Sequence, residues 1–99
     1  MTSRKVTLTP KEFAMIGRAL AEPRRVQMLK DLSARETCET CMTCGELQET
    51  QDITLPTLSH HIKELEAAGL IEVRREGRCG FLTLNREVLK AYLEELSRI

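Results

Sequence analysis

The feature that most constrains the fold of this chain is a short helical pattern followed, after only three residues, by a longer one. The first pattern spans residues 44–51 and begins with a Thr-x-x-Glu capping box. A turn follows at 52–54, and the second pattern runs over 55–68 until Gly69, a residue suited to the left-handed conformation that ends a helix. Two helices joined by so short a turn predict a helix-turn-helix.

Two further helices are predicted before this unit. The first begins at Pro10, inside a Thr-Pro-Lys-Glu capping box, and stops near Glu22, because the proline at position 23 disfavours a helical residue before it. Pro23 then opens the second helix, which fades around residues 33–34. Its apolar spacing predicts a core-facing side formed by Val26, Leu29 and Leu32, with Met28 at the edge of that side.

The remaining segments predict a polar loop, a hairpin and a last helix. Residues 35–42 are expected to form the loop, and residues 42–43 a very short strand. Strands are predicted over 71–75 and 79–84, joined by a turn, and a helix capped by asparagine runs from Arg86 to the C-terminus. The fold class is therefore mainly α with a small β-hairpin, a winged helix-turn-helix in the order α-α-α-α-β-β-α. We expect one domain, residues 1–99, because the chain has no linker and is too short for two cores.

The longer helix of the helix-turn-helix has two unlike faces. Leu58, Ile62 and Leu65 recur at helical spacing and predict the buried face. The opposite face is small, polar and able to form hydrogen bonds, and it carries Thr57, Ser59, His60, Lys63 and Glu64. A recognition helix presents such a surface to the major groove of DNA, although an ordinary solvated helix face has the same composition.

The predicted hairpin adds a basic tip beside this helix. Arg74, Arg75 and Arg78 cluster around Gly77. Arginines at such a tip can reach the DNA backbone or the minor groove, which is what the wing of a winged helix does. Two nearby glutamates dilute the charge, so a hairpin that is merely solvated is the alternative.

Three stretches of the chain resemble the ArsR/SmtB family of winged-helix repressors, and together they span about residues 10–98. Residues 19–29, ALAEPRRVQML, are similar to the family's opening, and residues 54–71, TLPTLSHHIKELEAAGLI, to its recognition segment. Arg-Glu-Gly-Arg at 75–78 matches its wing turn. Leu55 departs from the pattern, because the family often has Gln there, which puts one base contact in question.

The resemblance implies a dimeric, sequence-specific DNA-binding repressor that leaves a palindromic operator when an effector binds. By position, DNA contacts would come from Thr57, Ser59, His60 and Lys63 of the helix and from Arg75 and Arg78 of the wing. His61 corresponds to a position that the family keeps partly buried, so we interpret it as structural.

Charge and hydropathy agree with such a protein. Fifteen basic and fifteen acidic side chains cancel, which argues against indiscriminate coating of nucleic acid but leaves room for one local basic face. Residues 1–35 carry an excess of five positive charges, and residues 36–53 an excess of five negative ones. The chain has neither a signal-peptide pattern nor an apolar run that could span a membrane, so we expect a soluble, cytoplasmic protein without a membrane partner.

Apolar residues on the first and last helices predict a homodimer. The last helix carries a wide apolar stripe that a monomer of this size has little left to cover. Packing of two copies through both helices would set two recognition helices about one DNA turn apart. A stripe that only folds back on its own core is the alternative. The expected interface residues are Phe13, Ile16, Leu20, Leu89, Tyr92, Leu93 and Leu96.

Four cysteines point to metal or thiol chemistry. Cys38, Cys41 and Cys44 form a C-x2-C-x2-C pattern just before the predicted helix-turn-helix. Three thiolates so close together could bind As(III) or Sb(III), or Zn(II) with a fourth ligand. They could equally close a reversible disulfide, or be inert. Arsenic-sensing members of the family carry a C-x-C pair near this position, so the spacing here differs by a residue. Cys79 lies apart, with no assigned role.

Other classes of function fit less well. An iron–sulfur run would need a fourth cysteine where Gln48 stands. The zinc sites that some family members build on the last helix are not expected, because this chain has no histidine after His61. No phosphate-binding loop or catalytic constellation is present, and we expect no enzyme. The remote alternatives are a thiol oxidoreductase that uses the cysteines and a winged helix that binds protein.

Overall fold

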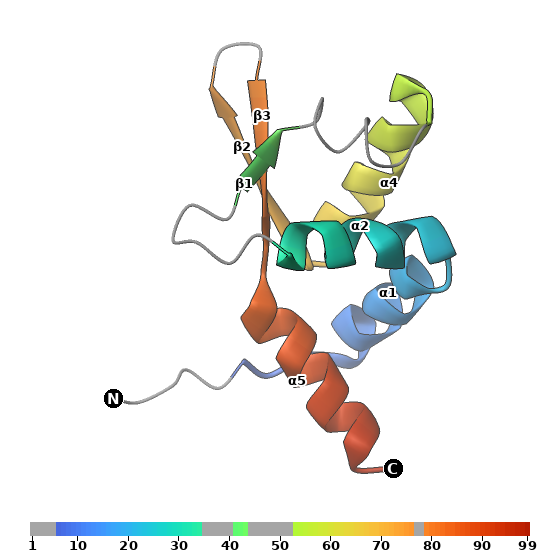
Figure 1. Ribbon diagram of the computed structural model, residues 1–99. Coiled ribbons are helices and arrows are strands. Elements are labelled where there is room, and N and C mark those ends of the chain that lie inside the picture. Colours follow the sequence, from blue (N-terminus) through green and yellow to red (C-terminus); the bar gives the residue numbers. More distant parts are fainter. Residues whose placement is uncertain (1–5, 35–40, 44–52, 77–78) are drawn as a thin grey trace.

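A computed structural model describes residues 6–34, 41–43, 53–76 and 79–99 of the chain. Its elements follow the predicted order: helices α1 and α2, a short strand β1, helix α4, strands β2 and β3, and helix α5 (Figure 1). The winged fold predicted from the sequence is confirmed. The short helix predicted over residues 44–51 lies outside the described residues.

The first two helices begin where their capping signals predicted. In α1 (Pro10–Leu20), the Thr9 hydroxyl accepts from the backbone N–H of Glu12, and the Glu12 carboxylate accepts from that of Thr9, so the capping box is complete. Helix α2 (Pro23–Ser33) has Glu22 as its N-cap, with its carboxylate accepting from the N–H of Arg24.

The inward face of α2 differs from the prediction by one position. Met28 has no exposed surface, whereas the neighbouring Val26 is only partly buried. The contact face is therefore centred on Met28, Leu29 and Leu32 rather than on Val26. The helical position of Met28 predicted it at the edge of the apolar face, but the flexible methionine side chain can fill a core gap between branched side chains.

The wing is part of a three-stranded antiparallel sheet in the order β1-β3-β2. Strands β2 (Ile71–Glu76) and β3 (Cys79–Leu84) form the predicted hairpin, and the short strand β1 (Cys41–Thr43) pairs along the other side of β3. The very short strand expected at 42–43 is therefore present, and it begins one residue earlier, at Cys41, which had been expected in the loop. Pairing with β3 draws this residue into the sheet.

Helix α4 (Leu55–Ala67) ends as its glycine predicted. Gly69 has a φ of +78°, and the N–H of Leu70 bonds to the carbonyl of Leu65 across it. The chain then enters β2 directly, and Ile71 is buried two residues after the glycine. This tight exit fixes the wing relative to α4, which packs against both β2 and α1.

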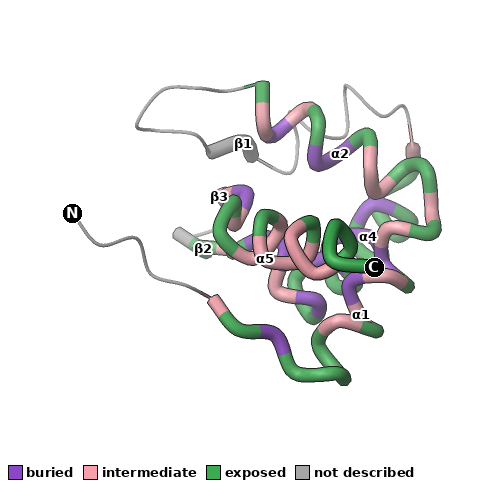
Figure 2. The backbone as a smooth tube through the Cα atoms, turned by 90° about the horizontal axis from the view of Figure 1, so that it is seen from below, coloured by how far each residue is buried: buried purple, intermediate pink, exposed green. Residues whose placement is uncertain are grey.

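The core lies where α1, α2, α4 and the hairpin meet (Figure 2). It is made of aliphatic side chains contributed by every one of these elements. The side chains that are almost completely buried are Ile16, Met28, Leu32, Leu58, Leu65, Leu70 and Leu82.

Helix α5 (Arg86–Ser97) begins at its predicted cap, Asn85, but none of its residues is fully buried. Its partly buried side includes Tyr92, whose ring lies 4.8 Å from that of Phe13 on α1. Leu93 and Leu96 remain exposed. Among the described residues, no helix is long and apolar enough to cross a membrane.

One residue assigned to the dimer interface belongs elsewhere. Ile16 has no exposed surface within a single chain, so it is a core residue of the protomer and cannot contact a second copy in this conformation. The apolar stripe of α1 placed it beside Phe13 and Leu20, but helical spacing does not distinguish a residue facing the protomer core from one facing a partner.

Candidate nucleic-acid interface

The candidate interface is built around α4, whose two faces are cleanly separated. Four side chains on its inner face are buried, three aliphatic ones and His61, with exposed fractions of 7% or less. The outer face carries the residues predicted to contact DNA, and all of them are exposed: Thr57, Ser59, His60 and Lys63, together with Glu64. The predicted division of this helix into a buried and a polar face is therefore confirmed.

The N-terminus of α4 is capped and faces outward. The Thr54 hydroxyl accepts from the backbone N–H of Thr57 at 3.4 Å and donates to the Thr57 hydroxyl at 2.9 Å. Thr57 is thus tied to the helix start, which limits the orientations its hydroxyl can adopt. Leu55, the first residue of α4, is 58% exposed and presents an apolar side chain beside this polar surface. An exposed helix N-terminus also favours a phosphate through its partial positive charge.

His61 has the structural role that was predicted, and it has a partner that the sequence did not reveal. Its Nδ1 accepts a hydrogen bond of 3.1 Å from Nε of Arg25 on α2. Burial lowers the pKa of His61 below the ordinary 6.5; Arg25 lowers it further, and Glu22 opposes this shift. The imidazole is therefore held in its neutral form with Nδ1 unprotonated.

The Arg25–His61 contact joins residues 36 positions apart. No spacing rule connects two such distant positions, so Arg25 could not be identified from the sequence. The only available signal was a basic residue within the apolar periodicity of α2, which is too common to identify a contact.

The wing presents one of its predicted arginines as expected. Arg75 is exposed on β2, and its cross-strand neighbour is Gly80, which carries no side chain to cover it. Arg74 is also exposed, but its guanidinium lies 5.1 Å from the centre of the Phe81 ring, the position paired with it across the hairpin. Arg78 lies outside the described residues.

Only one cysteine of the C-x2-C-x2-C pattern, Cys41, lies within the described residues. The backbone of Cys41 lies in β1 opposite Thr83 of β3, and Cys79 begins β3. Cys38 and Cys44 lie outside the described residues, so the three positions are not seen together. Within the part of the chain that is described, no group of three metal-ligating side chains comes together.

A family model described as a helix-turn-helix domain matches residues 20–74, more than half of the chain. The arsenical resistance operon repressor of Staphylococcus xylosus is 37% identical over 79 residues, which cover 80% of this chain and 71% of the relative. The chain belongs to the ArsR family. This conclusion agrees with the resemblance noted in the sequence, and it makes the chain a DNA-binding transcriptional repressor rather than an enzyme such as a thiol oxidoreductase.

Solved structures of ArsR regulators share the fold described above. A crystal structure of an ArsR family transcriptional regulator superposes with a TM-score of 0.80 at 29% identity, covering 94% of this chain and 91% of the other. A winged helix-turn-helix DNA-binding domain from Mycobacterium bovis, solved in solution as a homodimer, has a TM-score of 0.69 at 22% identity, with 93% and 87% coverage. At that identity, the second likeness concerns the fold alone.

Proposed function

We propose that this ArsR repressor contacts its operator through the outer face of α4, with Ser59, His60 and Lys63 in the major groove and Thr57 at its edge. The observation that carries the proposal is the separation of faces on α4. The residues of its inner side are buried in the core, whereas every polar residue of the outer side is exposed. Small hydroxyl side chains and a histidine can bond to base edges, and a lysine to phosphate.

The wing supplies the second contact in this proposal. Arg75, which is exposed and lies opposite a glycine, contacts the neighbouring backbone or minor groove. The same contact is expected for Arg78 from the sequence alone, because this residue lies outside the described ranges. Arg74 is the least suited of the three arginines, because its guanidinium already stacks on Phe81.

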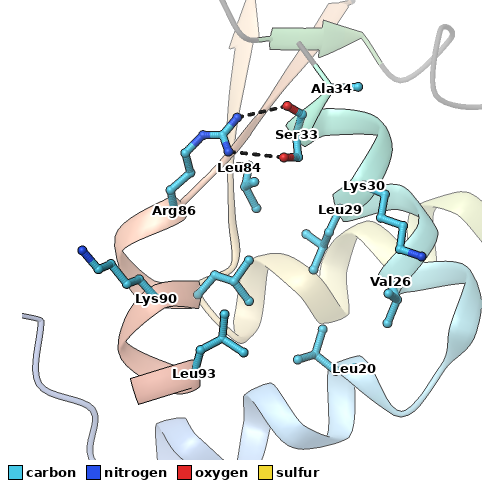
Figure 3. A pocket seen from close by; sticks show the side chains of 11 residues that line it. Leu20, Val26, Leu29, Lys30, Ser33, Ala34, Leu84, Arg86, Lys90 and Leu93 are labelled. Carbon is cyan, nitrogen blue, oxygen red and sulfur yellow. Dashed lines mark hydrogen bonds between the residues drawn. The ribbon is translucent and has the colours of Figure 1, made fainter. Parts of the chain in front are cut away.

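We further propose that two copies associate through α5 and the exposed end of α1. An open groove of about 760 Å³ between α2 and α5 has an apolar lining that includes three of the predicted interface leucines, Leu20, Leu89 and Leu93. Leu20 and Leu93 face this groove from α1 and α5 (Figure 3). Leu93 is 54% exposed and Leu96 39% exposed on the same helix, so the apolar surface continues beyond the groove. The homodimer of the M. bovis domain supports a second copy as its occupant.

The proposed effector is thiophilic: As(III) or Sb(III), or else Zn(II), bound by Cys38, Cys41 and Cys44. The cysteine spacing and the names of the arsenical resistance relatives support this assignment. Cys41 lies in β1, which pairs with β3. A displacement of Cys41 on effector binding would therefore act on the sheet that includes the wing. A reversible disulfide among the same cysteines is the second candidate, because its formation would also displace Cys41 and so act on β1.

The test of DNA binding is a salt titration with DNA from upstream of the coding sequence, followed by fluorescence anisotropy. Lys63→Ala should weaken binding and lower the salt slope by about one. Lys11→Ala is the matched control, because Lys11 is also an exposed lysine but lies on α1. Equal effects of the two substitutions would contradict the proposed contact surface.

The effector is tested in the same assay with arsenite, antimonite, zinc and peroxide, each added separately. A coupling of about 1–3 kcal/mol would change operator affinity about 5–150-fold in the wild type. Cys41→Ser and Cys44→Ser should abolish the response, whereas Cys79→Ser, which removes the cysteine outside the pattern, should keep it. A response that survives in all three variants would rule out the cysteine site.

A further inference from the structure

The side chain of Arg25, on α2, forms hydrogen bonds to two neighbouring helices, α1 and α4. Nε of Arg25 donates to Nδ1 of His61 on α4 at 3.1 Å. Its Nη1 lies 3.4 Å from the carbonyl oxygen of Ala19 and 3.5 Å from that of Arg18, both at the end of α1. The guanidinium on α2 therefore links the last turn of α1 to the buried side of α4.

Each part of this contact is chemically well matched. The last carbonyls of a helix carry partial negative charge, so they attract a guanidinium, and the Arg18 carbonyl can accept it in addition to the N–H of Ala21. Arginine presents its donors in a fixed planar fork, so Nε and Nη1 can bond in two directions at once without rotation of the group. The third partner, His61, must be neutral at Nδ1 to accept, which is the form that its buried position favours.

The position of the contact connects it to DNA binding. His61 immediately follows His60 and lies two residues from both Ser59 and Lys63, but on the opposite face of the helix. Aliphatic burial holds α4 against the core, but the hydrophobic driving force is itself non-directional. A hydrogen bond from a tethered guanidinium adds the direction that such packing lacks.

We propose that Arg25 is a positioning residue for operator recognition, which sets the rotation of α4 through His61 and so determines where Ser59, His60 and Lys63 meet the groove. This inference rests on the proposed role of α4 in DNA binding. Arg25 does not itself contact DNA in this proposal, and its effect passes entirely through the buried imidazole.

The test compares operator affinity in variants that keep or remove the bond. Arg25→Lys retains the charge but not the planar fork, and His61→Leu removes the acceptor. Each should weaken operator binding about tenfold, and the double variant should also lose about tenfold, because both changes break the same contact. A hundredfold loss in the double variant would show independent effects and would overturn the proposal.

A conservative variant and a control separate positioning from general stability. His61→Asn keeps an acceptor oxygen close to the place of Nδ1 and should restore most of the affinity that His61→Leu loses. Gln27→Leu is the matched control: Gln27 donates to the Asp31 carboxylate within α2 itself at 3.0 Å, and it does not line the groove between α2 and α5. It should leave operator affinity within about twofold of the wild type. If His61→Asn binds as poorly as His61→Leu, the proposal is wrong.

A pH profile supplies a readout that a merely structural role would not give. Protonation of His61 would turn Nδ1 into a donor and set a cation beside Arg25, near Arg24, His60 and the opposing Glu22. Operator affinity measured in a His60→Gln background should therefore fall as the pH is lowered through the depressed pKa of His61, which lies below the ordinary 6.5, and His61→Asn should remove that fall. An unchanged profile in His61→Asn would contradict the mechanism.

The same assays distinguish failure of this inference from failure of the proposed function. If Lys63→Ala leaves binding unchanged, α4 does not contact DNA and both ideas fail. If Lys63→Ala weakens binding but Arg25→Lys, shown by circular dichroism to be folded at the assay temperature, does not, only the positioning role is rejected.

Discussion

Helices α4 and α5 are both amphipathic, but one protomer covers only the first of them. Four residues of α4 are buried, whereas α5 has none. The apolar side of α4 packs against α1 and β2, and its outer face remains polar. The apolar side of α5 borders an open groove and continues to the exposed Leu93 and Leu96.

The difference shows how a small chain can divide two tasks between similar helices. A helix that is satisfied within the protomer can offer its other face to DNA without losing stability. A helix that leaves apolar surface exposed gains stability only when something covers that surface. We therefore expect substitutions on α4 to change folding and DNA contact, and those on α5 to change association.

The largest expected effect is the loss of a core leucine from α4. Leu65 has no exposed surface, so Leu65→Ala should lower the free energy of unfolding by about 2–5 kcal/mol. Leu93→Ala on α5 should cost less than about 1 kcal/mol at protein concentrations too low for association, because this side chain is already half exposed. Urea titrations of both variants give the comparison, and equal losses would show that the two helices do not differ.

The next effect concerns the oligomeric state. Leu93→Glu should raise the dimer dissociation constant at least about tenfold, since it brings a charge into the apolar surface of α5. Leu55→Glu is the matched control, because Leu55 is similarly exposed, 58% against 54%, but lies on α4. Sedimentation equilibrium measures both, and a similar shift in the control would mean that association does not depend on α5.

Much of this architecture could be predicted because its signals are local. The caps at Thr9, Thr54 and Asn85 act within three residues, and Gly69 ends α4 by its own backbone conformation. Alternating apolar residues in a strand likewise identify an inward face, and Leu82 and Leu84 of β3, two positions apart, are both buried.

What could not be predicted depends on contacts between distant segments. The partner of His61 lies 36 residues away, and β1 exists through its pairing with β3, a strand about forty residues later. Ile16 was assigned to the wrong surface for a similar reason: its helix face was identified correctly, but which body packs on that face is decided by the tertiary arrangement.

A third prediction contrasts a glycine at the end of α4 with one that faces α5. Gly69→Ala should cost about 1–2 kcal/mol, because alanine is strained at a φ of +78°, although its Cβ would lie 3.9 Å from the nearest atom, Cγ1 of Val88. In Gly17→Ala the Cβ would meet the Tyr92 hydroxyl at 3.3 Å, at the movable end of a partly exposed side chain. Helix propensity should then stabilise the protein by up to about 1 kcal/mol. The midpoint of thermal unfolding should therefore fall in Gly69→Ala and rise in Gly17→Ala, relative to the wild type.

The smallest effect comes from a single buried group on α4. The pKa of His61 is lowered in the folded chain, mainly by burial and then by Arg25, so the unfolded chain binds a proton more readily. The stability that depends on the neutral imidazole is complete above about pH 6.5 and is lost as the pH falls from there through the lowered pKa. Urea midpoints between pH 7.5 and 5.5 should fall more steeply for the wild type than for His61→Asn, while His60→Gln, a change at an exposed neighbour, should keep the wild-type slope. Parallel curves for the wild type and His61→Asn would mean that burial of this imidazole contributes nothing to the pH dependence. The inner face of α4 would then be held by its aliphatic contacts alone.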